Sequence, residues 1–534
     1  MPQLPNRARP QYWLNHIVYH PIQTILAIGL ITLVFALQLP SLRFETSIYD
    51  LTIEDLPETV AYNQFKKAFG CEEIILVVLK TNGVFQPETF RQIEQLAQSL
   101  SQIDGIKRVI SLPDIKKAMD ITDKWDLTNF QRVVSKVALF QRNLISKDEK
   151  TTVITLVLVD LHQKERVIRA VEGFLDDYQD SFSLYQVGMP IVSSALAKFT
   201  RQDFLTLPVI TFSLICLALF FFFRNLRGIL IPSGTVVIAL IWTFGLMAWT
   251  GTPLSLLTMI VPVFLIAVGT AYCMYIFPEY RSAVRQSAGP REASIQCFKR
   301  LGFPTSLAVI TTTIGLGSLL INRVTEIRDF AIFSCVGILS LLLIMLTFLP
   351  AVMGLTPLPK RSSAHPFRKP NFLDRVLSKI IRLNLHHQRI ILPLVALIAI
   401  IGGIGMSRIK VETNPVGFFK KDTEVARHFN DIYQDMSGSF PLSVVVGSEE
   451  EGYFEDPGHL KQIERIQRFL DSLPGVDKTI SFVDYLKLIN YATNQYDPTF
   501  YVLPEEPFEV RMLVNSFKTM LGPVSYTHLT LPTN

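Results

Sequence analysis

Hydroxyl side chains stand inside two long apolar stretches, where each polar group needs a partner or water. The candidate residues of the first stretch are Gly269, Thr270, Ala271, Tyr272 and Tyr275, and those of the second are Thr311, Thr312, Thr313, Gly315 and Gly317. Such hydroxyls are able to line a polar seam or a water path. A tyrosine, however, titrates only near pH ~10, and a threonine does not titrate in this range. The pattern therefore indicates passage or binding, and not proton storage.

The same residues have a structural interpretation, and the sequence favours it. Threonine in a helix can bond its own backbone, and tyrosine can reach the membrane interface. The Thr311–Thr313 run with Gly315 and Gly317 predicts close helix packing, because small residues let backbones approach. Asp329, which stands beside Arg328, is expected to anchor the boundary of a span or to form an ion pair in a loop.

Chemistry of other kinds has no support in the sequence. The five cysteines form no metal-ligand pattern and imply no disulfide framework. No glycine-rich loop ends in Lys followed by Ser or Thr, which argues against a built-in ATPase. A net charge of +5 is small for 534 residues and gives no nucleic-acid footprint. We therefore expect no enzyme, no cofactor, no metal and no nucleic-acid partner.

The elements that carry these residues are predicted to cross a membrane. The chain is 49% hydrophobic and only 18% charged, which is too apolar for an ordinary soluble protein. Segments long enough for a hydrocarbon core of about 30 Å occur at 21–39, 204–223, 228–249, 254–277, 302–321, 330–355 and 390–406. None of the seven contains Asp, Glu, Lys, Arg or His. The predicted fold class is a polytopic α-helical membrane protein.

Basic residues give the orientation. Lys and Arg gather in residues 1–20, 224–227, 281–300 and 356–389, whereas the alternate connections are short and far less basic. All four basic segments share one side if the N-terminus is cytoplasmic, as the positive-inside rule requires. We therefore expect a multi-pass protein of the plasma (inner) membrane.

Two parts of the chain repeat each other about 370 residues apart. Residues 42–46 recur as 409–413, and Gly105 and Ser111 recur as Gly475 and Ser481. The apolar positions Phe90, Ile93, Leu96, Leu100 and Ile103 recur at the same spacing as Leu460, Ile463, Ile466, Leu470 and Leu473. Two halves that run in the same direction are a known plan for moving substrates across a bilayer.

Residues 40–203 and 407–523 lie outside the cytoplasm in this topology. The first region is predicted to consist of strands and helices, at 73–79, 87–103, 105–111, 126–144, 151–160, 163–178 and 183–187. Strand-helix-strand given twice is the split βαβ, ferredoxin-like order. The second region begins in the same way, with a strand at 442–446, a helix at 459–473 and a strand at 476–481, and lacks the second half of the pattern.

Three terminal or linking segments complete the division of the chain. Residues 1–20 and 356–389 each carry an amphipathic lead-in, either an interface helix or an extension of the span that follows. Residues 524–534 interrupt an outer domain that has not returned to the membrane, and we expect them to be a non-native tail.

Spans four to six carry a recognisable set of motifs. These are Ala267-Val268-Gly269-Thr270-Ala271-Tyr272, Glu279-Tyr280-Arg281, Thr311 to Leu319, Ile327-Arg328-Asp329-Phe330 and Leu349-Pro350-Ala351. Together they resemble the resistance-nodulation-division (RND) superfamily, in its MMPL-type and sterol-sensing-domain-like branch. The resemblance covers almost the whole chain, as one complete half and the start of a second. It implies an RND-type transmembrane bundle with porter-type ferredoxin-like outer domains.

The resemblance also implies a permease that exports lipidic or other hydrophobic molecules. Many members carry Gly-x-Asp-Tyr in span four, where the carboxylate is the proton carrier, and this chain has Ala271 in that place. Three explanations are therefore open: the missing second half supplies the proton site, the protein uses another driving force, or it does not pump. A non-transporting lipid sensor or scaffold is the alternative. Membrane lipids and an amphiphilic substrate are the expected partners, and a homo-oligomer or accessory envelope proteins stay open.

Overall fold

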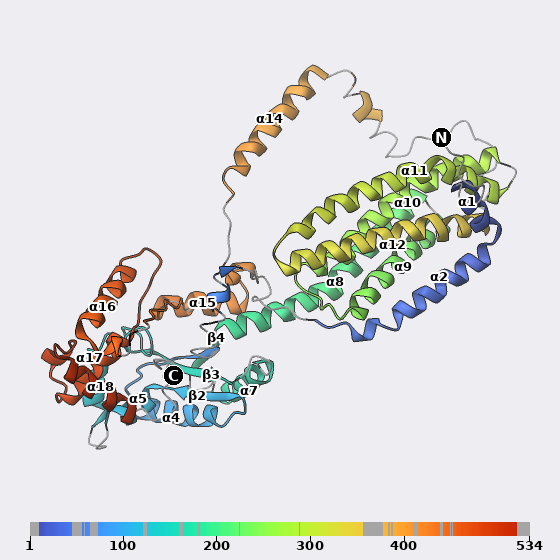
Figure 1. The fold of residues 1–534 in the computed structure, drawn as a ribbon. Coiled ribbons are helices and arrows are strands. Elements are labelled where there is room, and N and C mark those ends of the chain that lie inside the picture. The colour runs from blue at the N-terminus through green and yellow to red at the C-terminus, as the bar shows by residue number, and fades with distance from the viewer. Residues whose placement is uncertain are drawn as a thin grey trace.

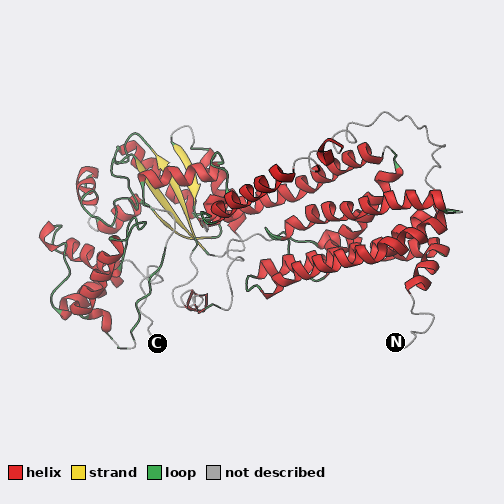
Figure 2. Ribbon diagram, turned by 90° about the horizontal axis from the view of Figure 1, so that it is seen from above, coloured by secondary structure: helices red, strands yellow, loops and turns green. Residues whose placement is uncertain are grey.

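The computed structural model describes residues 10–44, 56–57, 59–62, 64, 73–120, 125–159, 164–178, 182–223, 225–287, 289–355, 378–382, 385, 388–409, 414–437, 442–448, 450 and 452–520. Long helices form a bundle, and a four-stranded sheet with shorter helices forms a separate part (Figure 1). The strands of the described residues lie at the end of the molecule away from the bundle (Figure 2). The expected tail at 524–534 and most of the linker at 356–389 lie outside the described residues.

Seven helices are long and apolar enough to cross a membrane, and they fall on the seven predicted stretches. They are α2 (Pro21–Ala36), α8 (Met189–Phe223), α9 (Arg227–Trp249), α10 (Val261–Gln286), α11 (Pro290–Gly317), α12 (Thr325–Leu355) and α14 (Gln388–Met406). The prediction of a polytopic α-helical membrane protein is confirmed. Six of these helices pack together, whereas no residue of the apolar window of α14 is buried (Figure 1).

Glycines bring the bundle helices into close contact at three points. A Cβ on Gly245 of α9 would lie 2.5 Å from the Phe35 carbonyl oxygen of α2. A Cβ on Gly269 of α10 would lie 2.7 Å from Val236, and one on Gly337 of α12 would lie 2.6 Å from Leu265. Small residues thus set the helix spacing, as they do in membrane proteins where lipid gives apolar helices little reason to associate.

The first outer region contains one antiparallel sheet. Its strands β1 (Ile74–Lys80), β2 (Ile106–Ile110), β3 (Thr151–Leu158) and β4 (Ser183–Val187) lie in the order β2-β3-β1-β4. β3 and β1 are central, and each is flanked by antiparallel neighbours. All four strands occur where the sequence predicts them. β1 and β2 do not pair with each other, because β3 lies between them.

Helices cover one face of this sheet. α4 (Pro87–Ser101), α5 (Leu112–Met119), α6 (Leu127–Val134) and α7 (Lys164–Asp176) enclose the largest apolar core of the region. α4 buries Phe90, Ile93, Leu96 and Leu100, which recur at the three- and four-residue spacing of one helix face. That spacing is the signal from which the sequence predicts the helix.

β4 of the sheet joins α8 of the bundle through a single residue. β4 ends at Val187 and α8 begins at Met189, so that Gly188 alone makes the turn. Gly188 has φ +142°, and a Cβ there would lie 2.5 Å from the Ile74 carbonyl oxygen, so no larger residue fits. The 35 residues of α8 extend about 52 Å at 1.5 Å per residue, well beyond a hydrocarbon core of about 30 Å. One continuous helix therefore runs from the sheet through the bundle.

The second outer region reproduces the first at an offset of 370 residues. α16 (Pro457–Asp471) has the bounds of α4 shifted by that offset. Gly105 and Gly475 follow these helices with φ 98° and 96°. Ser111 and Ser481 then each form a capping box with an aspartate at the N3 position, at the start of α5 and of α17 (Phe482–Thr493). The helix, the positive-φ glycine and the capping box of the predicted repeat are therefore present in both regions.

The second region departs from the prediction at its strands. Residues 442–448 and 476–480 are described without strand structure, whereas the sequence predicts strands there. In the first region β1 and β2 are both held by β3, and the described residues include no counterpart of β3 in the second. A strand without a partner leaves its backbone groups unpaired, so these segments adopt no ladder.

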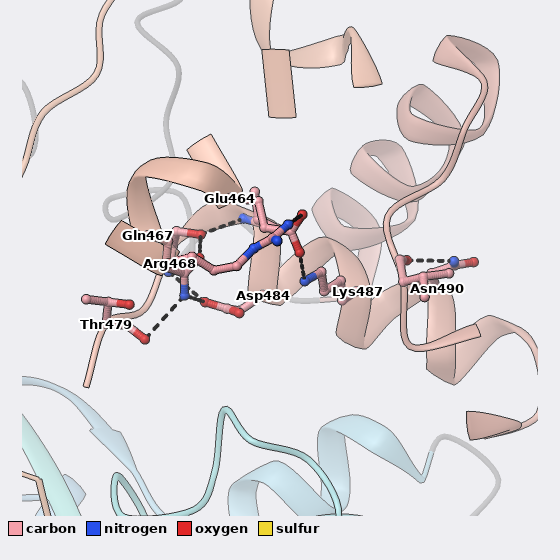
Figure 3. Close-up of polar contacts among 10 residues, drawn as sticks. Glu464, Gln467, Arg468, Thr479, Asp484, Lys487 and Asn490 are labelled. Atoms are coloured by element: carbon pink, nitrogen blue, oxygen red, sulfur yellow. Dashed lines mark hydrogen bonds and ion pairs between the residues drawn. The ribbon is translucent and has the colours of Figure 1, made fainter. Parts of the chain in front are cut away.

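In the second region, side-chain hydrogen bonds connect the helices. Figure 3 shows Glu464 of α16 accepting hydrogen bonds from Lys487 and Arg468, at 2.6 and 2.8 Å. Gln467 donates to Asp484 at 2.7 Å and thereby ties α16 to the start of α17. The remaining helices are α15 (Glu424–Asp435) and α18 (Pro507–Met520), with 3-10 turns η7 (Pro415–Phe418), η8 (Tyr453–Glu455) and η9 (Pro498–Phe500).

The N-terminal lead-in is a separate helix. α1 (Pro10–Tyr19) ends one residue before the start of α2, and His20 between them has φ −115° and ψ 55°. α1 packs on α11 and α12, with Val18 fully buried and Trp13 63% exposed. Three 3-10 turns complete the bundle: η2 (Leu39–Ser41), η5 (Thr258–Ile260) and η6 (Ser318–Ile321). The second lead-in falls largely outside the described residues.

Candidate functional site

The span-four motif presents its residues to different surroundings. Gly269 faces the bundle interior, where Val236 and Leu341 crowd it. Thr270 is buried and donates its hydroxyl to the Ile266 carbonyl at 2.6 Å. Ala271 is exposed, and Tyr275 is 70% exposed, so both face away from the packed helices. The motif therefore wraps around α10 and does not form one pocket.

The span-five residues mostly satisfy their own helix. Thr311 and Thr312 donate to the Ala308 carbonyl at 2.9 and 2.8 Å, and Thr313 donates to the Val309 carbonyl at 2.9 Å. Thr270 bonds its own helix in the same way, as its structural interpretation expects. Such bonds remove the cost of a bare hydroxyl inside an apolar medium.

The predicted close packing at Gly315 and Gly317 is not found within the described chain. A Cβ on Gly315 would meet nothing within 4 Å, and one on Gly317 would meet only the Cys335 sulfur at 3.9 Å. Gly315 is exposed on the outward side of α11, while other residues of that helix make its contacts with α12. Sequence alone identifies a small-residue run, but it does not say which side of the helix the run occupies.

One contact joins the two motifs. The Tyr272 and Thr312 hydroxyls lie 3.4 Å apart, between α10 and α11. The stretches 254–277 and 302–321 contain no Asp, Glu, Lys, Arg or His. This pair is thus able to hold a water molecule or a polar group between the two helices.

The start of α12 holds two carboxylates. Asp329 is half-buried beside Arg328, at the boundary position that the sequence predicts. Glu326, one turn earlier, is only 4% exposed. The sequence interpretation overlooked Glu326, because a glutamate in the first turn of a helix is ordinary and nothing in the pattern indicates its burial.

The outer regions contain a polar cluster that sequence reasoning missed, where α15 lies against the sheet. The Lys80 ammonium of β1 lies 2.7 Å from Asp431 and 2.9 Å from Asp435, both on α15. The Tyr185 hydroxyl of β4 donates to Asp431 at 2.6 Å, and the Thr151 hydroxyl of β3 donates to Asp435 at 3.0 Å. Three strands of the first region thus bind one helix that follows the seventh span.

Electrostatics favours the ionised form of this cluster. Burial alone raises the pKa of Asp431, but hydrogen bonds from Lys80 and Tyr185 outweigh it and hold that pKa below its ordinary value. Burial lowers the pKa of Lys80, yet the two aspartates more than reverse this and raise it. Burial, and then Asp431, raise the pKa of Tyr185, so its hydroxyl stays protonated and donates.

Apolar contacts continue the same interface. Phe429, Ile432 and Met436 of the α15 segment are buried together with residues of the sheet, namely Val78, Val153, Tyr185 and Val187. α4 to α7 cover the other face of the sheet, so α15 supplies the second layer. The sequence does indicate an amphipathic helix here, because residues 425, 426, 429 and 432 form one apolar helix face. It does not indicate which surface that face packs against.

A second contact between the outer regions lies around Lys478. Its ammonium donates to the backbone carbonyls of Ala138 and Gln141 in the first region. Burial lowers the pKa of Lys478 to about 8. Nearby, the Tyr496 hydroxyl donates to the Met119 carbonyl at 2.8 Å, and its ring lies 4.5 Å from that of Trp125. The second region therefore contacts the first around Lys478 and Tyr496 as well as along α15.

A groove of about 940 Å³ opens beside the first of these contacts. Its walls come from β4, from α7 and from the first turns of α15, so both halves of the chain contribute. His428 of α15 stacks on the Tyr185 ring with 4.4 Å between centroids. The described residues contain no group of three or more His, Cys, Asp or Glu with metal-binding geometry.

Comparisons with known proteins agree with this architecture. The sequence model of the MMPL family matches residues 51–370, which is more than half of the chain. A putative membrane protein of Methanocaldococcus jannaschii is 20% identical over 350 residues, covering 62% of this chain and 90% of the relative. The apo-petrobactin exporter of Bacillus anthracis is 23% identical over 342 residues, or 61% of this chain and 44% of the exporter.

A third relative is the multidrug resistance protein MdtC of an Enterobacter species. It is 28% identical over 247 residues, which cover 43% of this chain and 23% of that protein. The chain thus spans less than half the length of this relative and of the exporter. The resemblance that the span motifs indicate is confirmed, and the chain belongs to the MMPL family.

Proposed function

We propose that this chain acts in an RND/MMPL-type exporter that moves lipidic or other hydrophobic molecules out of the plasma membrane. The family match and its two named relatives support a membrane transporter in general terms. The lipidic class of substrate is the part that we add. It rests on the large apolar surface of the bundle, where outward-facing side chains such as Leu214 and Ile314 are more than half exposed and lipid has direct access.

The proposed orientation places the N-terminus in the cytoplasm and both outer regions on the far side. Its support is the distribution of Lys and Arg, which gather at one end of the spans. We further propose that the first outer region is a porter-type domain of ferredoxin-like topology. The antiparallel order β2-β3-β1-β4 supports this, because it interlocks two strand-helix-strand units.

The observation that carries the proposal is the mechanical path from bundle to groove. α8 is continuous through its span and reaches β4 through Gly188 alone. β4 forms a wall of the groove, and α15 of the second half is held to β4 by Tyr185 and Asp431. A tilt of α8 within the membrane is therefore passed to β4, which is a wall of a ligand-sized groove, and to the α15 helix that is bound to β4. Rocking of this kind is how paired halves give alternating access.

The absence of a proton-carrying residue in the predicted spans is the reason for considering a second function. Ala271 stands where a proton-carrying aspartate is expected in the family, and the seven predicted stretches contain no carboxylate. The rival is a lipid sensor or scaffold that uses the same bundle without transport. Cofactors have no role in either proposal, and no arrangement of the described residues supports an enzyme.

Reconstitution into proteoliposomes separates these functions. A fluorescent phospholipid and Nile red are loaded, and their transfer to acceptor vesicles is followed with and without an imposed pH gradient. Transfer above empty liposomes supports the exporter, and loss of transfer when the gradient is collapsed assigns proton coupling. Transfer equal to that of empty liposomes under both conditions contradicts the exporter and favours the sensor.

A further inference from the structure

The N-terminal helix α1 is fixed across one end of the bundle, away from the sheet (Figure 1). Its inner side packs on α11 and α12, where Val18 is fully buried and Leu14 packs against the bundle core. A Cβ on Gly354, at the end of α12, would lie 3.2 Å from Val18 Cγ1 and 3.7 Å from Arg291 Cγ of α11. α1, the end of α12 and the start of α11 therefore meet at one place.

The outer side of α1 presents side chains that carry rings. Tyr12, Trp13 and Tyr19 are 51%, 63% and 53% exposed. His16 is exposed on the same side, and its ring centroid lies 4.7 Å from that of His20. Trp and Tyr are the residues that membrane proteins place where lipid meets water, because their rings are apolar and carry one polar atom. The outer side of α1 is thus suited to the head-group region of a bilayer.

The neighbouring span places α1 at that level. α2 begins at Pro21, one residue after His20, and its first turns leave Ile22 and Leu26 65% and 67% exposed. Apolar side chains on the outside of a span are stable against the hydrocarbon chains of lipid. The outer side of α1 therefore continues the apolar outside of α2 at the point where the span starts.

The charge at this end of the bundle is positive. Residues 279–300 carry five Lys or Arg and two Glu. Glu279 is bound by Arg300 at 2.9 Å, and the second glutamate directly follows Arg291 and is exposed. Arg291 is exposed as well, and its guanidinium carbon lies 5.9 Å from the centre of the Tyr19 ring. The excess of cations beside α1 is complementary to the negative surface of a membrane with anionic lipids.

We propose that the outer side of α1, together with Arg291, binds the head groups of anionic phospholipids. The Arg291 guanidinium holds the phosphate, and the rings of Trp13 and Tyr19 lie among the glycerol and first methylene groups. A zwitterionic lipid offers the same contacts to the rings but brings no net charge to Arg291. Because α1 contacts the end of α12 and the start of α11, a bound lipid fastens both helices to the membrane surface. The assignment to the cytoplasmic leaflet rests on the proposed function and its orientation, whereas the binding itself does not.

Short-range quenching of Trp13 by brominated lipids tests this inference. The purified full chain in dodecyl maltoside micelles is titrated with phosphatidylglycerol or phosphatidylcholine whose acyl chains carry bromine near the glycerol. The W13F variant supplies the signal of the other three tryptophans, which is subtracted. We expect half-maximal quenching of Trp13 at about tenfold less phosphatidylglycerol than phosphatidylcholine, with the difference shrinking as salt is raised.

Arginine variants separate the site from charge in general. R291Q should raise the phosphatidylglycerol concentration for half-maximal quenching about fivefold, whereas R291K should keep most of the preference. Unchanged quenching by phosphatidylcholine in R291Q shows that α1 is still in place. R323Q removes an exposed arginine just after η6, at the opposite end of the bundle, and as the matched control should behave as the native chain does.

Three results overturn the inference. These are equal quenching by the two lipids, an equal loss in R291Q and R323Q, and displacement of phosphatidylglycerol by inorganic phosphate at matched ionic strength, which would assign a soluble anion. Phosphatidylglycerol binding at α1 without any lipid transfer in proteoliposomes would contradict the proposed exporter and leave the α1 assignment standing.

Discussion

The Lys80 ammonium lies 2.7 Å from the Asp431 carboxylate, although 351 residues separate the two. Lys80 is the last residue of the central strand β1, and Asp431 is on the helix that follows the seventh span. The same carboxylate accepts from Tyr185 of β4. This contact therefore fastens the second half of the repeat to the sheet of the first.

The Lys80–Asp431 contact should be worth a modest but measurable coupling. Both side chains are about one-third exposed, which weakens the pair through solvent screening. In a double-mutant cycle of Lys80→Met and Asp431→Asn, we expect a coupling of about 1 kcal/mol in the unfolding free energy, falling with added salt. Denaturant unfolding of the full chain in detergent measures it. Strict additivity of the two substitutions would contradict the contact.

Close packing of α2 against α9 should depend on Gly245. Gly245→Ala places a Cβ 2.5 Å from the Phe35 carbonyl oxygen, where backbone must move. We expect a destabilisation of about 2 kcal/mol, measured by thermal unfolding in detergent. Gly315→Ala is the matched control, since its Cβ meets nothing within 4 Å and alanine favours helix. A neutral Gly245→Ala, or an equal loss at Gly315, would show that the helices pack differently.

Stability should rise with pH above about 8 because of Lys478. Its pKa is lowered by burial to about 8 in the folded state, against 10.5 when unfolded. Between these values the unfolded chain binds more protons, so unfolding becomes harder as pH rises. We expect a gain on the order of 1 kcal/mol between pH 8 and pH 10, after allowance for partial exposure.

The Lys478→Met variant removes this pH dependence, whereas Lys461→Met on the exposed side of α16 keeps it. Chemical denaturation at a series of pH values provides the readout. A pH dependence that survives in Lys478→Met would assign it to another group and would place the Lys478 side chain in solvent.

The repeat makes a prediction about equal effects at distant positions. Ser111 and Ser481 each complete a capping box, with Asp114 and Asp484. Alanine at either serine should cost about 1 kcal/mol, because an orphan N–H at the helix start loses its acceptor. Ser101→Ala, at the exposed end of α4, serves as the control. Hydrogen exchange of α5 and α17 localises each loss, and protection unchanged in one of the two helices would contradict their equivalence.

Sequence predicts well those elements whose periodicity is local. The seven spans follow from uninterrupted apolar runs, and α4 follows from the spacing of Phe90, Ile93, Leu96 and Leu100. The repeat is visible in the sequence because each unit ends with a glycine at positive φ and a serine that caps the next helix. The strand predicted at 442–446 is not present. A strand depends on hydrogen bonds to a neighbouring strand, and its own residues do not specify that neighbour.

Among the site residues, too, local features can be predicted from the sequence and tertiary contacts cannot. Backbone bonding of Thr270 can be expected from its residue type alone, and Thr270 donates to the Ile266 carbonyl. The Lys80 cluster and the groove could not be foreseen, because they join residues of β1, β4 and α15 that lie hundreds of positions apart. Charged residues on amphipathic elements are common, and only tertiary packing decides which of them meet.

The contact between Lys80 and Asp431 requires both outer regions to occupy one compartment. Gln95 of α4 and Arg465 of α16 are exposed at equivalent positions of the repeat, and Arg285 stands at the basic end of the spans. Single cysteines at these positions, in a chain whose five native cysteines are replaced, are labelled in oriented membranes with an impermeant maleimide. We expect the Gln95→Cys and Arg465→Cys variants to react from one side and Arg285→Cys from the other. Labelling of Gln95→Cys and Arg465→Cys from opposite sides would contradict the account.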